Sequence, residues 1–495
     1  MEVPTSPLIA TILCTLGILG LFIFDWDRKT RTSKALWISL VWMILAVSAS
    51  KWLQSGPRSA ADQFEGNPIQ RNVFTLLLAI GIIVLLQRSQ KLIAMLQMNG
   101  PILLFFTYCA ASILWSDFPE VAFKRLIKAL GDLVMVLIIL TDPEPLAALK
   151  RFLARTGFLL VPVSILLIKY YPDLGMAYKS ADGRRVFEGV TNDKNMLGVI
   201  CLLIGLGAVW RILHLLRDRQ YRQSLKPLFA QGLLLAMVLW LFLYANSMTS
   251  LACFALASAL MLASSFPSVA RRGAMMHAMV IAILTVASLA LIPDLRGSLV
   301  KDLGRDPTLT GRTELWSEIV VMNGNPLFGT GFESFWMGPR LEKIWSKHWW
   351  HPNEAHNGYL EVYLNLGWTG LALLAIVLLS GYRNAFSGFR RDPIVGRLKV
   401  SFFVVGVMYS LTEAGFRLLN PVWISFMLGA IAMPKSLTPA TPDVGEFRAD
   451  RLKPDVSPQN HELIRPGKTE RHKPVASTLG HQQVQRLPLK KPVIG

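Results

Sequence analysis

A polar stretch that leads into an apolar segment carries the residue best suited to acid–base chemistry. It reads HPNEAHNGYLEVYLNLGWTG over residues 351–370, with His356 near its polar end. Histidine has an ordinary pKa of about 6.5, so it can exchange a proton near neutral pH. We therefore predict that His356 is a general base that takes a proton from a reacting hydroxyl group. The alternative is an interfacial histidine without chemistry.

The glycines after His356 are spaced to hold it in place. On a helix that begins at about Asn357, Gly367 lies about 16 Å beyond His356 and on the same face, with Gly370 alongside. Small residues on one face allow another helix to approach closely. We expect the glycines to dock this helix and to fix His356 at the membrane rim.

Arg312, in LTGRTELWSEIV, opens an amphipathic stretch that runs to Met322. A helix N-terminus attracts anions, and an arginine there strengthens the attraction, because its fork of donors matches phosphate oxygens. We predict that Arg312 binds an anion; the alternative is a surface ion pair with Glu314 or another local acid.

Further cations stand in other polar connectors. Arg184 and Arg185, in KSADGRRVFEGVTNDKN, suit a negatively charged substrate at the outer interface, or else form a solvated loop. Lys124 and Arg125 follow the stretch WSDFP at 115–119. They are either interfacial anchors or residues that grip a lipid phosphate.

A metal site is a weaker interpretation of the same region. His348, His351, Glu354 and His356 lie within nine residues, but HWWHPNEAH lacks the HExxH spacing, and Pro352 interrupts a helix. We predict no metal site. The four cysteines fall inside apolar runs and indicate neither a disulfide framework nor a metal centre.

The composition indicates a membrane protein. Of 495 residues, 52% are hydrophobic and 17% are charged, with a mean hydropathy of +0.42. Soluble proteins carry about 25% charged residues. The net charge of +19 lies in loops and in the tail, which is typical of cytoplasmic connectors and excludes nucleic-acid binding as the main reading.

The apolar runs predict an all-α polytopic membrane protein with about twelve or thirteen transmembrane helices, the first a retained helix over 8–24. Basic connectors predicted to be cytoplasmic are 27–34, 87–91, 211–226, 269–272 and 382–391. Connectors predicted to face outward are 52–71, 115–124, 170–196, 245–248 and 293–358.

These runs divide the chain into two parts. Residues 1–433 form a membrane domain, which contains a large, partly helical, outward-facing loop at 293–358 where we expect function to lie. Residues 434–495 are rich in Pro, Lys, Arg and Ser, and we predict a disordered, basic, cytoplasmic tail.

Taken together, these motifs resemble the O-antigen ligase and exopolysaccharide polymerase superfamily. Its ligase-type motif is His-Asn, nine residues, then GxxG; here it reads His356-Asn357, GYLEVYLNL, and GWTG at 367–370. GRTELW…NPLFGTGFESF is similar to the family loop whose arginine binds a lipid diphosphate. EGNPIQR (65–71), WSDFPEVAFKR (115–125), NSMTSL (246–251) and LTEAG (411–415) resemble the exopolysaccharide polymerase branch.

The resemblance implies a metal-independent glycosyltransferase in the bacterial inner membrane, with its active site facing the periplasm and without a cofactor. It also implies that the large loop at 293–358 is periplasmic and catalytic. His356 and Arg312 would be catalytic, with His356 as base and Arg312 on the diphosphate. The residues with implied substrate-binding roles are Arg185, Arg184, Asn195, Lys124, Arg125 and Asn357. Relatives commonly carry a basic residue at the positions that correspond to 247–250, where this chain has Ser, Met, Thr and Ser. Lys124 or Arg125 could supply the missing phosphate contact.

The implied reaction polymerises oligosaccharide repeat units carried on undecaprenyl diphosphate into exopolysaccharide. The implied partners are this lipid-linked glycan, membrane lipids, and other polysaccharide assembly and chain-length proteins, but no nucleic acid. One alternative is a ligase that transfers the glycan to the lipid A core. The alternative from another class is a lipid-glycan transporter, which would place ionisable residues at mid-membrane and show internal repeats.

Overall fold

The computed structural model describes six stretches of the chain: 6–27, 30–53, 67–178, 183–217, 225–289 and 312–434. The predicted tail lies outside the described residues from position 435 onward, as does the first part of the predicted loop, 293–311. Every described residue belongs to one compact unit, Met1–Pro439.

The described residues are almost entirely helical, which confirms the all-α class. The longer helices are α1 (Pro7–Phe24), α2 (Leu36–Trp52), α4 (Pro68–Gln87), α5 (Ser89–Met98), α6 (Gly100–Ala111), α7 (Pro119–Leu140), α8 (Pro145–Tyr170), α10 (Lys194–Arg217), α11 (Lys226–Ala245), α12 (Met248–Ala263), α14 (Gly273–Leu289), α16 (Arg312–Val321), α17 (Gly338–Lys347), α18 (Gly358–Arg391), α19 (Pro393–Thr412) and α20 (Pro421–Ala430).

Short elements complete the described part of the chain: η1 (Ser112–Trp115), α9 (Pro172–Gly175), α13 (Pro267–Ala270), and the strands β1 (Met176–Tyr178) and β2 (Arg185–Phe187). The two strands pair antiparallel, with Met176 opposite Phe187. The sequence analysis did not foresee this hairpin, which lies in the predicted outward connector 170–196.

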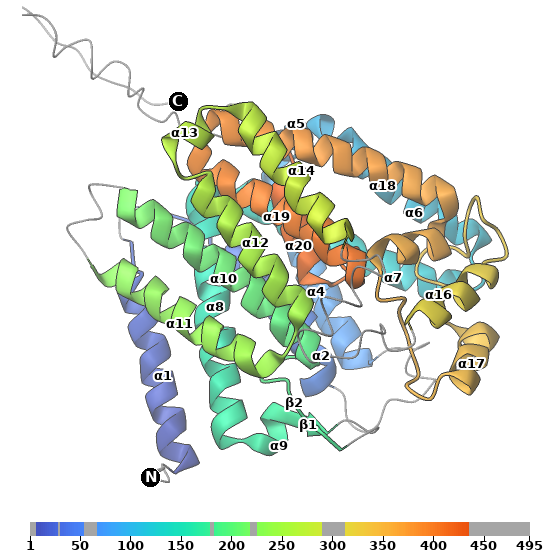
Figure 1. Cartoon of the computed structure of the whole chain (residues 1–495), viewed down its shortest axis with the longest axis horizontal. Helices are drawn as coiled ribbons and strands as arrows, with labels where there is room; N and C mark the ends of the chain where they lie inside the picture. The colour runs from blue at the N-terminus through green and yellow to red at the C-terminus, as the bar shows by residue number, and fades with distance from the viewer. Residues whose placement is uncertain are drawn as a thin grey trace, which may run out of the picture. The chain divides into compact units, whose positions relative to one another are not determined.

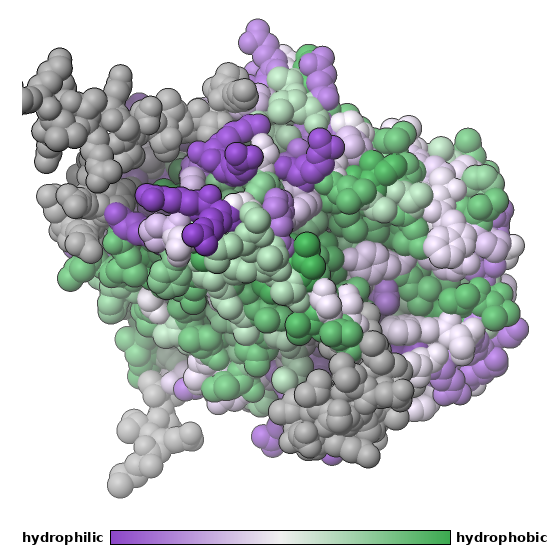
Figure 2. All heavy atoms as spheres, turned by 45° about the horizontal axis from the view of Figure 1, so that its top comes forward, coloured by the Kyte–Doolittle hydropathy of each residue, from purple (hydrophilic) through white to green (hydrophobic). Residues whose placement is uncertain are grey.

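Seven described helices are long and apolar enough to cross a membrane: α1, α4, α8, α10, α11, α18 and α19. The pair α5 and α6–η1, bent by 89°, would add an eighth. Shorter apolar helices are α2, α12, α14 and α20, so a count of twelve or thirteen depends on these pieces. Large exposed apolar side chains cover much of the face drawn in Figure 2. The protein is therefore a polytopic membrane protein.

Local sequence explains where many helices begin. Proline occupies the first turn of α4, α7, α8, α19 and α20, where its missing N–H group is not needed. The side chains of Asn67, Asn357, Asp392 and Asn420 accept hydrogen bonds from the backbone N–H groups of the helices that follow them.

Two connectors predicted to face outward contact each other: the Trp115 indole, from 115–124, donates to the carbonyl of Phe328, from 293–358, at 3.2 Å. Lys51, in the last turn of α2 beside the predicted connector 52–71, pairs with Glu188 of 170–196 at 3.1 Å. Arg151 of α8 donates to the carbonyl of Thr30 at 2.7 Å. The side of the membrane on which each connector lies stays a prediction.

Residues 312–357, which we term the cap, have a small core of their own (Figure 1). Leu315 and Ile319 of α16 are fully buried against Phe335 and against Ile344 of α17. This confirms the predicted amphipathic helix after Arg312. Leu364 of α18 belongs to the same cluster, so the first turns of α18 join the cap to the membrane helices.

The expected continuous helical face from His356 through Gly367 is wrong. Gly367 has φ 65° and ψ −165°, so the helix breaks there. A Cβ atom on Gly367 would lie 2.3 Å from the carbonyl group of Leu327, which means that the glycine receives a cap loop instead of another helix. The N–H group of Thr369 donates to that carbonyl at 3.1 Å.

We predict that Gly367→Ala lowers the thermal unfolding temperature of the purified protein. Its backbone conformation is open almost only to glycine, so any other residue costs about 1–3 kcal/mol before the clash with Leu327 is counted. Gly232→Ala in α11 is the control, because a Cβ atom there meets nothing within 4 Å. Equal unfolding temperatures for the two variants would contradict the assigned role of Gly367.

Candidate active site

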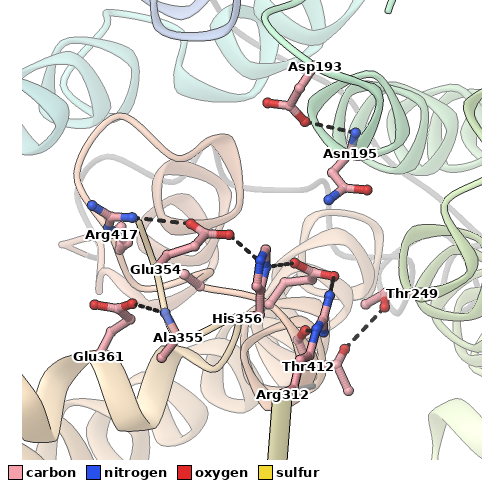
Figure 3. Close-up of polar contacts among 12 residues, drawn as sticks. Asp193, Asn195, Thr249, Arg312, Glu354, Ala355, His356, Glu361, Thr412 and Arg417 are labelled. Atoms are coloured by element: carbon pink, nitrogen blue, oxygen red, sulfur yellow. Dashed lines mark hydrogen bonds and ion pairs between the residues drawn. The ribbon is translucent and has the colours of Figure 1, made fainter. Parts of the chain in front are cut away.

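His356 stands in a strained turn between two carboxylates (Figure 3). Its φ of 49° is unusual for a residue other than glycine. The ring atom Nδ1 lies 2.8 Å from Glu354 Oε1 and 3.0 Å from Glu413 Oε2. The other ring nitrogen, Nε2, has no hydrogen-bond partner among the described residues. The ring is therefore held from one side and left available on the other.

The two carboxylates change the basicity of the imidazole. Burial lowers the pKa of His356, but hydrogen bonds and charges from Glu354 and Glu413 outweigh it and raise the pKa from 6.5 to about 9. Burial raises the pKa of Glu354, but His356 and Arg417 hold it at about 2. At neutral pH the ring is mainly an imidazolium that becomes a stronger base once deprotonated. Its stabilising effect on the fold is present below about pH 6.5 and lost as the pH rises through about 9.

Glu413 joins the two residues predicted to be catalytic. The guanidinium of Arg312, the first residue of α16, donates to the carbonyl of Thr412 at 2.7 Å and to Glu413 Oε1 at 3.2 Å. The other oxygen of Glu413 holds His356. The partner of Arg312 is thus Glu413 and not the local acid Glu314. In addition, Thr249, from the NSMTSL stretch, shares a hydrogen bond of 3.1 Å with the hydroxyl of Thr412.

Arg417 forms ion pairs with two carboxylates, of which one is Glu354. Its guanidinium lies 3.1 Å from Glu354 Oε2 and 3.3 Å from Glu333 Oε2. Burial lowers the pKa of Arg417, but the surrounding glutamates raise it above its usual range. Positive and negative groups therefore alternate from Arg312 through Glu413, His356 and Glu354 to Arg417.

The turn that carries His356 is also fixed from within the cap. Glu361, in the first turn of α18, accepts a hydrogen bond from the backbone N–H group of Ala355. The indole N–H group of Trp336 donates to both oxygens of Glu361 at 3.0 Å. Because Glu361 is 3% exposed, these bonds are shielded from water and restrain the turn.

The start of α10 contributes a further carboxylate to the site. Asp193 Oδ1 accepts hydrogen bonds from the backbone N–H groups of Asn195 at 2.8 Å and Met196 at 3.0 Å. Desolvation raises the pKa of Asp193, and the negative charges of Glu354 and Glu413 raise it further. The three carboxylates are therefore close enough to repel one another. Figure 3 shows the Asn195 side chain projecting from the same helix start.

The other predicted substrate-binding residues occupy different positions. Arg184 and Arg185 are exposed beside the hairpin, and Arg185 makes no polar contact with His356 or Arg312. Lys124 is exposed on α7, whereas Arg125 donates to the backbone carbonyl of Glu333, at the far end of the charged row. The structure therefore links Arg125 to the network through Glu333.

Asn357 has a structural task. Its side-chain oxygen accepts hydrogen bonds from the N–H groups of Tyr359 and Leu360, both at 3.0 Å. Its amide donates to the carbonyl of Leu411 at 3.2 Å. These contacts tie the start of α18 to the end of α19, which favours a positioning role over substrate contact.

Of the four residues weighed as a metal cluster, two have other partners. His348 bonds to Glu318 at 3.0 Å, and His351 stacks on Trp345 with ring centroids 5.0 Å apart. The other two, Glu354 and His356, stay together, and with Glu413 they place three donor atoms within 4.8 Å of one another. Arg312 and Arg417 already neutralise its two carboxylates and would repel a cation. The charge arrangement fits an ion-pair network better than a metal site.

Comparison with known proteins agrees with this class of molecule. Residues 230–375 match the protein family described as O-Antigen ligase. The chain is 24% identical over 350 residues to "Exopolysaccharide production protein ExoQ" of Rhizobium meliloti (strain 1021), covering 68% of this chain and 78% of the relative. The fold is that of a polytopic membrane protein, and these matches show what the chain is similar to. The predicted resemblance to the O-antigen ligase and exopolysaccharide polymerase superfamily is confirmed by them.

Two residues of the network were missed from sequence. Glu413 lies in LTEAG, a stretch noted only for its branch resemblance, and that resemblance was the available signal. Arg417 offered none, because nothing in its spacing connects it with Glu354, 63 residues away.

We predict that Glu413→Gln lowers the pKa of His356, because an uncharged amide no longer stabilises the imidazolium. The pKa should be measured by NMR on protein labelled with ¹⁵N-histidine, with the His356 signal assigned from the His356→Asn variant. Glu354→Gln should act in the same direction.

Glu342→Gln on α17 is the matched control, since Glu342 has no contact with His356. A pKa that stays at about 9 in both site variants would show that the two carboxylates do not set the basicity of the ring.

Proposed function

We propose that the protein polymerises oligosaccharide repeat units, carried on undecaprenyl diphosphate, into an exopolysaccharide. One observation carries the proposal: Glu413 connects the guanidinium of Arg312 with the imidazole of His356. A group that can bind a phosphate thus lies one carboxylate away from a group that can take a proton. Glycosyl transfer from a diphosphate carrier requires both.

Arg312 would bind the diphosphate of the donor. Its guanidinium is engaged by Glu413 and by a backbone carbonyl, so it is oriented before substrate arrives. Negative charge develops on the diphosphate as the bond from its oxygen to the anomeric carbon breaks. A preorganised donor aimed at such charge is typically worth about 2.7–4 kcal/mol. Arg125 and Asn195 are further candidates for contacts with the donor.

His356 would activate the acceptor. The reactive form is the neutral ring, in which Nδ1–H donates to a carboxylate and Nε2 carries no proton. The hydroxyl oxygen of the acceptor sugar attacks the anomeric carbon, its proton passes to Nε2 of this neutral His356, and undecaprenyl diphosphate leaves as an anion. Glu354 and Glu413 hold Nδ1 and stabilise the imidazolium that results. A diphosphate needs no proton to leave, so one base suffices, unlike the carboxylate pair of glycosidases.

The acceptor is proposed to be the terminal sugar of another lipid-linked repeat unit. The relative named for exopolysaccharide production supports a polymerase, whereas the family match, described as O-Antigen ligase, is compatible with transfer to a lipid A core. Supplying purified protein with each acceptor in turn separates the two reactions. We place the enzyme in the bacterial inner membrane with the cap in the periplasm, where other polysaccharide assembly and chain-length proteins could contact it.

We predict that His356→Asn lowers the rate of glycan transfer by about 10²–10⁴-fold, the usual effect of losing a general base. Asparagine is chosen because it tolerates the positive φ of this position. Arg312→Lys should lower kcat by about 10²–10³-fold, because lysine cannot reproduce the forked contact. The assay follows elongation of a purified lipid-linked repeat unit.

His351→Asn is the control, because His351 also has a positive φ but stacks on Trp345 outside the network. Wild-type elongation by His356→Asn would remove the base from the proposal.

We predict that a chelator leaves the elongation rate unchanged, since Arg312 and Arg417 satisfy the carboxylates that a metal would need. The rate should be measured before and after dialysis against EDTA. Loss of activity that zinc or magnesium restores would instead assign Glu354, His356 and Glu413 to a metal.

A further inference from the structure

A pocket of about 410 Å³ lies between the turn before α7 and the cap. Trp115 and Asp117, from the stretch WSDFP, form one side. The cap forms the other, with Gly324, Asn325, Phe328, Gly329, Thr330 and Arg340. The pocket shares no lining residue with the His356 network, and the proposed reaction gives WSDFP no role. We term it the Trp115 pocket.

Two aromatic rings line the Trp115 pocket, one from each side. Trp115 is 38% exposed and Phe328 is 44% exposed, with their ring centroids 5.8 Å apart. The indole N–H group of Trp115 donates to the carbonyl of Phe328, which fixes the orientation of its ring. The N–H groups of Leu327 and Phe328 donate to Asn325 Oδ1 at 3.1 and 3.2 Å, so the opposite ring is also held.

Polar side chains also line the pocket from both sides, and some of their hydrogen-bond donors and acceptors have no partner among the described residues. Arg340 donates to Asp117 Oδ2 at 2.8 Å and to the carbonyl of Phe335 at 3.1 Å. The side chain of Asp117 is 49% exposed, and its Oδ1 atom has no partner among the described residues. The amide nitrogen of Asn325 likewise has none within the described part of the chain.

Charge and polarity restrict the ligand. Asp117 neutralises Arg340, so the lining carries no excess positive charge to attract a phosphate. Only Trp115 and Phe328 contribute apolar side chains, which is too little to cover a prenyl chain. A sugar ring has C–H faces that pack on aromatic rings and hydroxyl groups that bond to carboxylates and amides. The lining therefore matches an uncharged sugar.

The first part of α18 connects the Trp115 pocket with the turn that carries His356. The N–H group of Trp368 donates to the carbonyl of Pro326, which anchors the pocket loop at the break in α18. His356 precedes the other end of this segment, Gly358–Leu366, whose nine residues span roughly 14 Å at 1.5 Å each. A glycan held here would be gripped at a distance from the reacting bond.

We propose that the Trp115 pocket binds an uncharged sugar residue of the glycan, away from the sugar that reacts. The proposal rests on the proposed function for the identity of that glycan. Such a contact would keep a growing chain on the enzyme between additions, because a second attachment makes rebinding of the end effectively intramolecular.

Binding is tested without turnover. The probe is the oligosaccharide released by mild acid from the lipid-linked repeat unit, which lacks the diphosphate, titrated calorimetrically into the full chain in nanodiscs. Asp117→Asn should weaken binding about tenfold or more, the effect expected from losing one charge-assisted hydrogen bond. Trp115→Leu should also weaken it, because the aromatic face that packs on the sugar is lost. Glu342→Gln and Trp349→Leu, which change exposed cap residues outside the pocket, should bind as the wild type does.

The variant His356→Asn separates this proposal from the proposed reaction, because it should lose transfer and still bind the free oligosaccharide. With active protein, Asp117→Asn should give shorter products at an unchanged rate of first transfer. Oligosaccharide affinities equal to wild type in both pocket variants would overturn the assignment. So would displacement of the oligosaccharide by undecaprenyl phosphate, which would make the occupant a lipid.

Discussion

The arrangement depends on one carboxylate that serves two cations. Glu413 holds Arg312 with one oxygen and His356 with the other, so neither cation can move without disturbing its neighbour. A carboxylate shared in this way transmits charge between them. In the proposed reaction, a diphosphate that draws Arg312 away from Glu413 would leave the full negative charge of this carboxylate to the His356 imidazole. Binding of the donor and the basicity of the ring would then be coupled through a single side chain.

Much of the scaffold follows from the sequence, because apolar length, proline at helix starts and basic connectors are local signals. They predicted the helical class and the helix after Arg312. The importance of His356 and Arg312 was also visible, since their residue types and contexts are unusual. Local signals cannot show which residues far apart in the sequence contact each other: Glu413 lies 57 residues from His356, and Arg417 lies 63 from Glu354.

The glycines Gly367 and Gly370 show that spacing alone does not reveal a break in a helix. Their spacing matched a straight helix, and we therefore predicted that another helix packs against them. The backbone at Gly367 instead takes a conformation that only the close approach of Leu327 explains. Sequence identifies a position that tolerates no side chain, but not which segment of the chain fills the space. The pairing of β1 with β2 was missed for another reason, because each strand has only three residues.

The network is divided between the cap, which supplies His356 and Glu354, and the connector between α19 and α20, which supplies Glu413 and Arg417. Chains are made from the N-terminus, so the cap emerges before its charged partners exist. Until the last two helices are inserted, the imidazole lacks Glu413 and Arg312 lacks its anchor. The charged network is therefore complete only after α19 and the connector that follows it have been made, so the order of synthesis leaves its assembly to one of the last steps.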